Sequence, residues 1–166
     1  FSSEFLEMLH HDREILVQLN ADWEKENNDP KFDKFRENIT DVFFDTNINP
    51  TGKLVLFSES VDTLNYLYDR LTNEIGRTDV LKVTATNRNR LEQTIKENFD
   101  ANFESDSMRY NIIITSDVLA EGVNLHRSNV IVNYDSPWNA TRLMQRIGRV
   151  NRIGSVAPNI YNYMFY

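Results

Sequence analysis

Short, continuous apolar runs alternate with longer helical stretches from residue 53 onward. The runs cover residues 54–57, 79–83, 111–114, 130–132 and 160–166. Strands that are apolar on both sides are typical of a parallel sheet with helices on both faces, because both faces are then buried. We therefore predict an α/β fold, built as a three-layer α/β/α sandwich with a mainly parallel sheet.

The segments between and before these runs predict helices. Residues 61–75 and 89–103 lie between strands, whereas residues 3–27 and 31–45 precede the first strand. Pro30 disfavours helical geometry in the residue before it and suits the first turn of a new helix, so it should separate the first two helices.

An arginine-rich segment spans residues 142–152, and its arginines are Arg142, Arg146, Arg149 and Arg152. Its apolar positions follow i, i+4, i+7 spacing at Leu143, Ile147 and Val150. This spacing predicts an amphipathic helix docked on a core. At about 100° per residue, Arg149 and Arg152 should lie about 60° apart on that helix. Two adjacent guanidiniums suit a multiply charged anion such as a triphosphate, although a solvated basic helix face is the alternative.

The net charge of −7 is unevenly distributed. Residues 1–50 hold twelve acidic and five basic residues, whereas residues 136–166 hold four arginines and no acidic residue. The overall charge therefore does not exclude a nucleic-acid partner. The chain has no cysteine, which excludes a disulfide scaffold or a thiolate zinc site and predicts a reducing, cytoplasmic setting. No apolar run approaches the ~18 residues of a membrane span, and the three histidines lack metal-ligand spacing, so we expect no membrane partner and no metal site.

Three segments resemble motifs of superfamily 2 helicases and translocases. Gln145–Arg152 is similar to motif VI, Gln-Arg-x-Gly-Arg-x-x-Arg, residues 114–125 to motif V, and residues 57–60 to motif IV. The resemblance covers residues 29–166 and implies the second RecA-like lobe, a helicase C-terminal domain. Residues 1–28 would then be a helical extension or the end of the connection between lobes. Pro-Trp-Asn upstream and Arg-Ile-Gly downstream favour the chromatin-remodeller-like branch of DNA translocases.

The resemblance also implies roles for individual residues. Arg149 and Arg152 would be catalytic arginine fingers. The residues expected at ATP are Gln145, Gly122 and Asn124. Those expected to contact the nucleic-acid backbone are Ser60 and Ser116, and those expected to support the site are Phe57, Asp117 and Arg146. Arg142 lies outside the motif and should matter less. Two alternatives stay open: Ser60 could be only a helix cap, and motif V only a strand–helix turn.

The other half of an ATPase site does not occur in the sequence. There is no Gly-x-x-x-x-Gly-Lys-Ser/Thr and no acidic pair after an apolar strand. ATP and Mg²⁺ should therefore be held mainly by a first RecA-like lobe that precedes this chain, and this chain alone should be inactive. The partners expected are that lobe and DNA, with RNA less favoured. The alternative functions are a helicase lobe fused to a restriction or repair nuclease, and a non-catalytic helicase-like binding module.

Overall fold

The computed structural model describes residues 2–26, 28–105, 108–119 and 122–166, and the chain divides into two compact units, Phe1–Asp33 and Lys34–Tyr166. Helix α1 (Ser3–Lys25) makes up most of the first unit. Ser2 caps it, because the Ser2 hydroxyl accepts the N–H of Phe5 at 3.2 Å. The predicted helix ended at Asn27, which lies outside the described residues. The expected boundary at 28/29 falls between α1 and the next helix.

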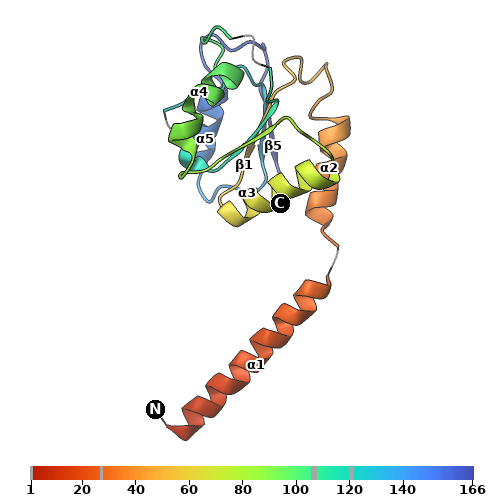
Figure 1. Cartoon of the computed structure of the whole chain (residues 1–166), viewed down its shortest axis with the longest axis vertical. Helices are drawn as coiled ribbons and strands as arrows, with labels where there is room; N and C mark the ends of the chain where they lie inside the picture. Colours follow the sequence, from red (N-terminus) through yellow and green to blue (C-terminus); the bar gives the residue numbers. More distant parts are fainter. Residues whose placement is uncertain (1, 27, 106–107, 120–121) are drawn as a thin grey trace. The chain divides into compact units, whose positions relative to one another are not determined.

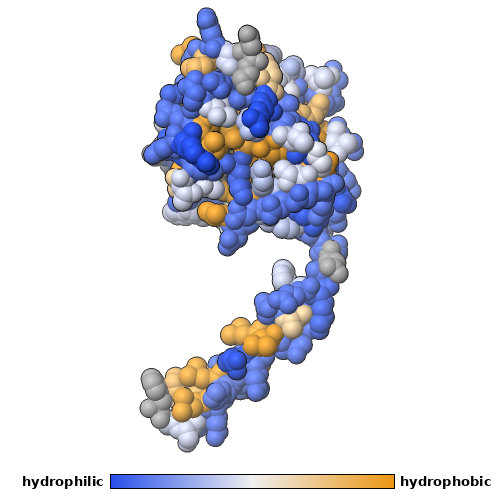
Figure 2. All heavy atoms as spheres, in the orientation of Figure 1, coloured by the Kyte–Doolittle hydropathy of each residue, from blue (hydrophilic) through white to orange (hydrophobic). Residues whose placement is uncertain are grey.

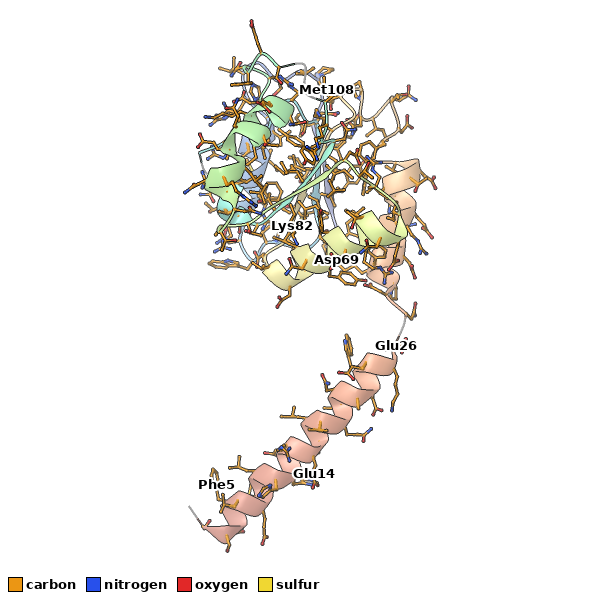
Figure 3. All side chains as sticks on the ribbon, in the orientation of Figure 1. Phe5, Glu14, Glu26, Asp69, Lys82 and Met108 are labelled. Carbon is orange, nitrogen blue, oxygen red and sulfur yellow. The ribbon has the colours of Figure 1, made fainter. Side chains whose placement is uncertain are left out.

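The surface of α1 mixes apolar and charged side chains, and none of its described residues is buried. Figure 2 shows the apolar patches along it, and Figure 3 marks Phe5 near its start and Glu14 in its middle. Its most exposed large apolar side chain is Trp23, at 81%. Among the helices of the described residues, none combines the length and apolarity needed to cross a bilayer.

The second unit is built on a five-stranded parallel sheet (Figure 1). Its strands are β1 (Leu54–Phe57), β2 (Val80–Val83), β3 (Ile112–Thr115), β4 (Val130–Asn133) and β5 (Tyr161–Met164). They lie in the order β2-β3-β1-β4-β5, and every neighbouring pair is parallel. All residues of β1, β3 and β4 are buried. The predicted α/β class and parallel sheet are confirmed.

Helices cover both faces of this sheet. On one face, α4 (Arg88–Phe99) and α5 (Ala140–Val150) contribute Phe99 and Val150 to a core that includes Val55 and Ile113. In Figure 1, α2 (Pro30–Asp41) and α3 (Val61–Asp69) lie on the other side of the strands. Lys82 of β2, marked in Figure 3, donates to the Asn65 side chain of α3 at 2.8 Å.

Helix ends differ from the prediction where side chains compete for the backbone. Helix α2 begins at Pro30 as expected but ends at Asp41 rather than at residue 45. Helix α3 continues as a π-helix, Arg70–Glu74, before Gly76. Helix α4 ends at Phe99 rather than at residue 103, because the Asp100 carboxylate accepts the N–H of Asn102 at 3.0 Å. Such local bonds offer the backbone an alternative to the helical ladder.

Candidate functional site

The carboxyl ends of β1, β3 and β4 meet at one edge of the sheet. Phe57 is in register with Thr115 on one side and with Asn133 on the other. The Ser58 N–H donates to the Thr115 carbonyl at 3.1 Å, and the Tyr134 N–H donates to the Phe57 carbonyl at 2.8 Å. The segments similar to motifs IV and V therefore begin side by side, at the edge where parallel sheets commonly bind ligands.

Arg146 is the centre of this edge and is fully buried. Its Nε donates to Asp117 Oδ1 at 2.7 Å, and its Nη1 donates to Asn133 Oδ1 at 3.0 Å. The guanidinium carbon lies 5.1 Å from the Phe57 ring centroid, and Nη2 lies 3.9 Å from Glu59 Oε1. These contacts join α5 to three strands. They place Phe57, Asp117 and Arg146 together, although their supporting role remains a prediction.

Arg142 shares a partner with Arg146. Its Nη1 donates to Asp117 Oδ2 at 2.9 Å and lies 3.8 Å from Glu59 Oε1, and its guanidinium lies 5.6 Å from the Trp138 ring centroid. Asn139 caps α5 by accepting the Arg142 N–H at 2.9 Å. We predicted that Arg142 lies outside the motif and matters less, which stays a prediction. In the structure it is a second cation on Asp117.

Arg152 is not on the helix, and the prediction of two arginines on one rigid helix is wrong. Helix α5 ends at Val150, and Asn151 has an extended backbone with φ −82° and ψ 90°. The Ser155 hydroxyl causes this end: it donates to the Val150 carbonyl at 2.9 Å and accepts the Arg152 N–H at 3.0 Å. Sequence periodicity carries no signal for this turn, because its bonds come from residues beyond the helix.

The exposed guanidinium of Arg152 is held by motif V. Its Nη1 donates to the Asn124 side-chain oxygen. Within the described ranges, no carboxylate forms an ion pair with Arg152, whereas Arg142 and Arg146 both pair with Asp117. Two arginines of the segment thus share two carboxylates, Asp117 and Glu59, and Arg152 keeps its charge available at the surface.

Gln145 and Arg149 remain on α5, four residues apart. Gln145 is exposed and Arg149 is half-buried. The Arg149 carbonyl accepts the N–H of Leu125, the residue after Asn124, at 2.9 Å. The end of α5 and the end of motif V are therefore bonded through both backbone and side chains.

Gly122 requires the backbone freedom of glycine. Its φ is +76°, and an added Cβ would lie 2.8 Å from Arg88 Nη2. Arg88 also donates to the Val118 carbonyl at 2.9 Å, so it braces this loop from the start of α4. Sequence reasoning missed Arg88, since nothing in its local pattern indicates a partner thirty residues away. Residues 120–121 of motif V lie outside the described residues.

Ser60 and Ser116 follow neighbouring strands. The Ser60 hydroxyl caps α3 by accepting the Thr63 N–H at 3.3 Å, so the capping alternative is observed. Its side chain is also exposed. Ser116 follows β3 directly and is half-buried. Contact of either residue with nucleic acid remains a prediction.

The edge is suited to stabilising an anion. Asp117 accepts from two arginines, and Asp135 accepts from the Ser58 hydroxyl. The carboxylates of this edge are therefore already engaged. Elsewhere in the described part of the chain, no group of three or more histidine, aspartate and glutamate side chains is placed to hold a metal ion.

Known proteins share this sequence and fold. Residues 31–154 match the family "Helicase conserved C-terminal domain". Over 52 residues, 31% of this chain, it is 46% identical to "Uncharacterized ATP-dependent helicase YqhH" of Bacillus subtilis (strain 168), covering 9% of that protein. Over 100 residues, 60% of this chain, it is 32% identical to "ATP-dependent RNA helicase eIF4A" of Mycosarcoma maydis, covering 22% of it. The chain thus spans less than a quarter of the length of these two relatives.

Two solved structures share the fold. "Crystal structure of the C-terminal part of Fun30 ATPase domain" superposes on 95% of this chain and 48% of its own, with a TM-score of 0.65 and 18% identity. "S. cerevisiae Dbp5 L327V bound to RNA and ADP BeF3" superposes on 82% of this chain and 32% of its own, with a TM-score of 0.59 and 26% identity. The parallel sheet, the convergence of three motifs at its carboxyl edge and the family match lead to one assignment. The chain belongs to the helicase conserved C-terminal domain family and is the RecA-like C-terminal lobe of a superfamily 2 helicase.

Proposed function

We propose that this chain is the second motor lobe of an ATP-dependent DNA translocase of the chromatin-remodeller-like branch. Arg149 and Arg152 would stabilise the charge of a transferring phosphoryl group, with Gln145, Gly122 and Asn124 facing the nucleotide. A first RecA-like lobe would hold ATP and Mg²⁺. Closure of the two lobes would bring the arginines to the phosphates and complete the catalytic site.

One observation supports this proposal above the others. Asp117 and Glu59 both lie against Arg142 and Arg146, whereas Arg152 is exposed and bonded to the uncharged side chain of Asn124. A cation at the edge that has no carboxylate partner among the described residues suits an anion supplied from outside the lobe. A purely structural arginine cluster would instead be neutralised throughout.

Ser60 and Ser116 would contact the nucleic-acid backbone, together with backbone N–H groups at the starts of their helices. Contacts of this kind carry little sequence information, so the motor should tolerate any sequence and weaken as salt rises. DNA is proposed on the similarity of residues 137–139 and 152–154 to DNA translocases. The matched proteins include RNA helicases, so the choice between DNA and RNA needs a direct test.

The test is nucleic-acid-stimulated ATP hydrolysis by the complete two-lobe protein. We expect turnover to rise with duplex DNA of unrelated sequences and to rise less with RNA of the same length. Stimulation by RNA alone would overturn the DNA assignment while preserving the motor. Absence of hydrolysis with every nucleic acid would favour the non-catalytic binding module instead.

A further inference from the structure

Arg152 lies beyond the end of α5, so the helix does not determine where its guanidinium points. The backbone near it is held by Ser155, whose N–H donates to the Arg152 carbonyl at 3.0 Å. The guanidinium itself is bonded to Asn124. The orientation of the Asn124 amide therefore decides whether Arg152 has an acceptor in front of it.

Asp100 selects that orientation. The Asn124 Nδ2 donates to Asp100 Oδ2 at 3.2 Å, which leaves Asn124 Oδ1 facing Arg152. A side-chain amide has one accepting and one donating end. Turning it over would place its NH₂ against the guanidinium N–H and its oxygen against the carboxylate. Arg152 and Asp100 thus favour the same orientation of the Asn124 amide. The Asp100 carboxylate does not move with Arg152, so it favours this orientation wherever the guanidinium lies.

Asp100 is itself well anchored. It is the residue at the end of α4, where its N–H donates to the Lys96 carbonyl at 3.1 Å. Its Oδ1 accepts the Asn102 N–H at 3.0 Å, whereas its Oδ2 accepts from Asn124. Each carboxylate oxygen therefore has its own donor. Only 13% of the side chain is exposed. A charge-assisted bond in so buried a place is stronger and better oriented than one at the surface.

His126 closes the other side of this carboxylate. It is 1% exposed, its Nδ1 lies 3.7 Å from Asp100 Oδ1, and neither ring nitrogen has a hydrogen-bond partner among the described residues. Burial lowers the pKa of His126 below 6.5; Asp100 opposes this, whereas Arg152 and Arg127 add to it. The imidazole is therefore neutral at neutral pH and leaves Asp100 Oδ2 to Asn124.

We propose that Asp100 is a positioning residue for Arg152, acting through the Asn124 amide. The inference rests on the proposed function, because it assigns a task to Asp100 only if Arg152 serves the reaction. None of the three motifs includes Asp100, which comes from the end of α4. The end of α4 would then be a fourth segment, besides the three motifs, that helps to orient the proposed arginine finger.

The test uses an isosteric change, Asp100→Asn. The new amide oxygen can still accept the Asn102 N–H, but its NH₂ then faces the Asn124 NH₂. Asn124 must turn over and present donors to Arg152. In the complete protein we expect kcat for ATP hydrolysis to fall on the order of 10-fold, as for other residues that orient a catalytic group. The KM for ATP should change little. Asp69→Asn, an exposed aspartate on α3, is the matched control.

A second substitution tests the mechanism. In Asp100→Asn/Asn124→Asp the new carboxylate accepts both from Arg152 and from the new amide, so Arg152 again has an acceptor in front of it. The 166-residue chain gives an independent readout in the NMR signals of the Arg152 guanidinium. Rotation and hydrogen exchange there should be slow in the wild type, faster in Asp100→Asn and slow again in the double variant.

The outcomes separate the two proposals. If Arg152→Ala lowers kcat strongly and Asp100→Asn does not, Asp100 has no positioning role. A positioning role is equally excluded if Asp100→Asn lowers kcat while the signals of the Arg152 guanidinium remain as slow as in the wild type. If Arg152→Ala leaves kcat unchanged, the arginine-finger function fails, and the guanidinium signals still decide whether Asp100 orients Arg152.

Discussion

The two edges of the sheet satisfy their polar side chains in different ways. At the amino edge, Lys53 is 1% exposed and donates to the Tyr110 carbonyl at 2.6 Å. Asn129, also 1% exposed, donates to the Ile48 carbonyl at 2.8 Å. These bonds fasten loops to their own scaffold.

At the carboxyl edge, side chains from different elements bond to one another. Arg146 pairs with Asp117, and Arg152 bonds to Asn124. The bond of the exposed Arg152 can be exchanged when a partner lobe or ligand arrives, whereas bonds of buried groups cannot be lost without leaving a buried polar group unsatisfied. We infer that the amino edge serves stability, and under the proposed function the carboxyl edge would serve the reaction.

The largest effect should come from the carboxyl edge. In the complete protein, Arg149→Ala or Arg152→Ala should lower kcat on the order of 10³-fold, because an arginine finger acts mainly in the transition state. ATP affinity, which depends on the first lobe, should change far less. Arg149→Lys should rescue little, because an ammonium cannot present the planar fork. Steady-state ATPase kinetics would measure these changes.

The control for this experiment belongs at the amino edge. Arg109 is exposed just before β3, so Arg109→Ala should leave kcat near the wild-type value. Arg142 is unsuitable as a control, because it shares Asp117 with Arg146. Equal losses for Arg109 and Arg152, or full turnover in an Arg149/Arg152 double variant, would contradict the division between the edges.

A second prediction concerns the buried ion pair. Asp117→Ala removes the strongest partner of the fully buried Arg146, and breaking such a pair should lower the free energy of unfolding by about 3 kcal/mol. Urea unfolding of the 166-residue chain would measure it. Asp69→Ala, at an exposed site, should change stability by less than about 0.5 kcal/mol. Equal effects of the two changes would show that the pair contributes little.

A third prediction tests the amino edge by pH. Burial lowers the pKa of Lys53 to about 8, with Arg127 adding to the effect and Asp79 opposing it. Between pH 8 and 10.5 the unfolded chain therefore binds more protons at Lys53 than the folded chain does, so stability from this residue rises with pH. The expected gain between pH 8 and 10 is about 2 kcal/mol. Below pH 8 the cost of burying the charge is fully present.

Lys53→Met should remove this part of the pH dependence, whereas Lys25→Met, on the exposed surface of α1, should not. The comparison uses denaturant unfolding of each variant at pH 7, 8, 9 and 10. Parallel curves of stability against pH for the wild type and Lys53→Met would mean that burial does not lower the pKa of Lys53.

The smallest effect is expected from the chain alone. It should hydrolyse no ATP above background, because its sequence has no Gly-x-x-x-x-Gly-Lys-Ser/Thr and no acidic pair after an apolar strand. Its binding to DNA should be weak, independent of sequence and steeply reduced by salt, given few phosphate contacts and a net charge of −7. Turnover assays and fluorescence anisotropy would measure both. Robust hydrolysis by the chain alone would contradict the proposal that a first lobe holds ATP and Mg²⁺. Sequence preference at high salt would contradict binding through the DNA backbone.

Regular local patterns made most of the fold predictable. Continuous apolar runs predicted the strands to within about two residues, and Pro30 and Asn139 marked the starts of α2 and α5. The segments that resemble motifs IV and V follow predicted strands, and the carboxyl ends of parallel strands share one edge. These features depend on neighbours in sequence or on the geometry of a parallel sheet, so the sequence by itself determined them.

Tertiary structure decided the arrangement of the charged side chains. Periodicity placed Arg152 on α5, but Ser155 ends the helix and Asn124 receives the guanidinium. Arg88 on Val118 and Asp100 on Asn124 are likewise contacts between distant segments. A long polar side chain can reach several partners, and only the packed fold determines which of them lies within hydrogen-bond distance.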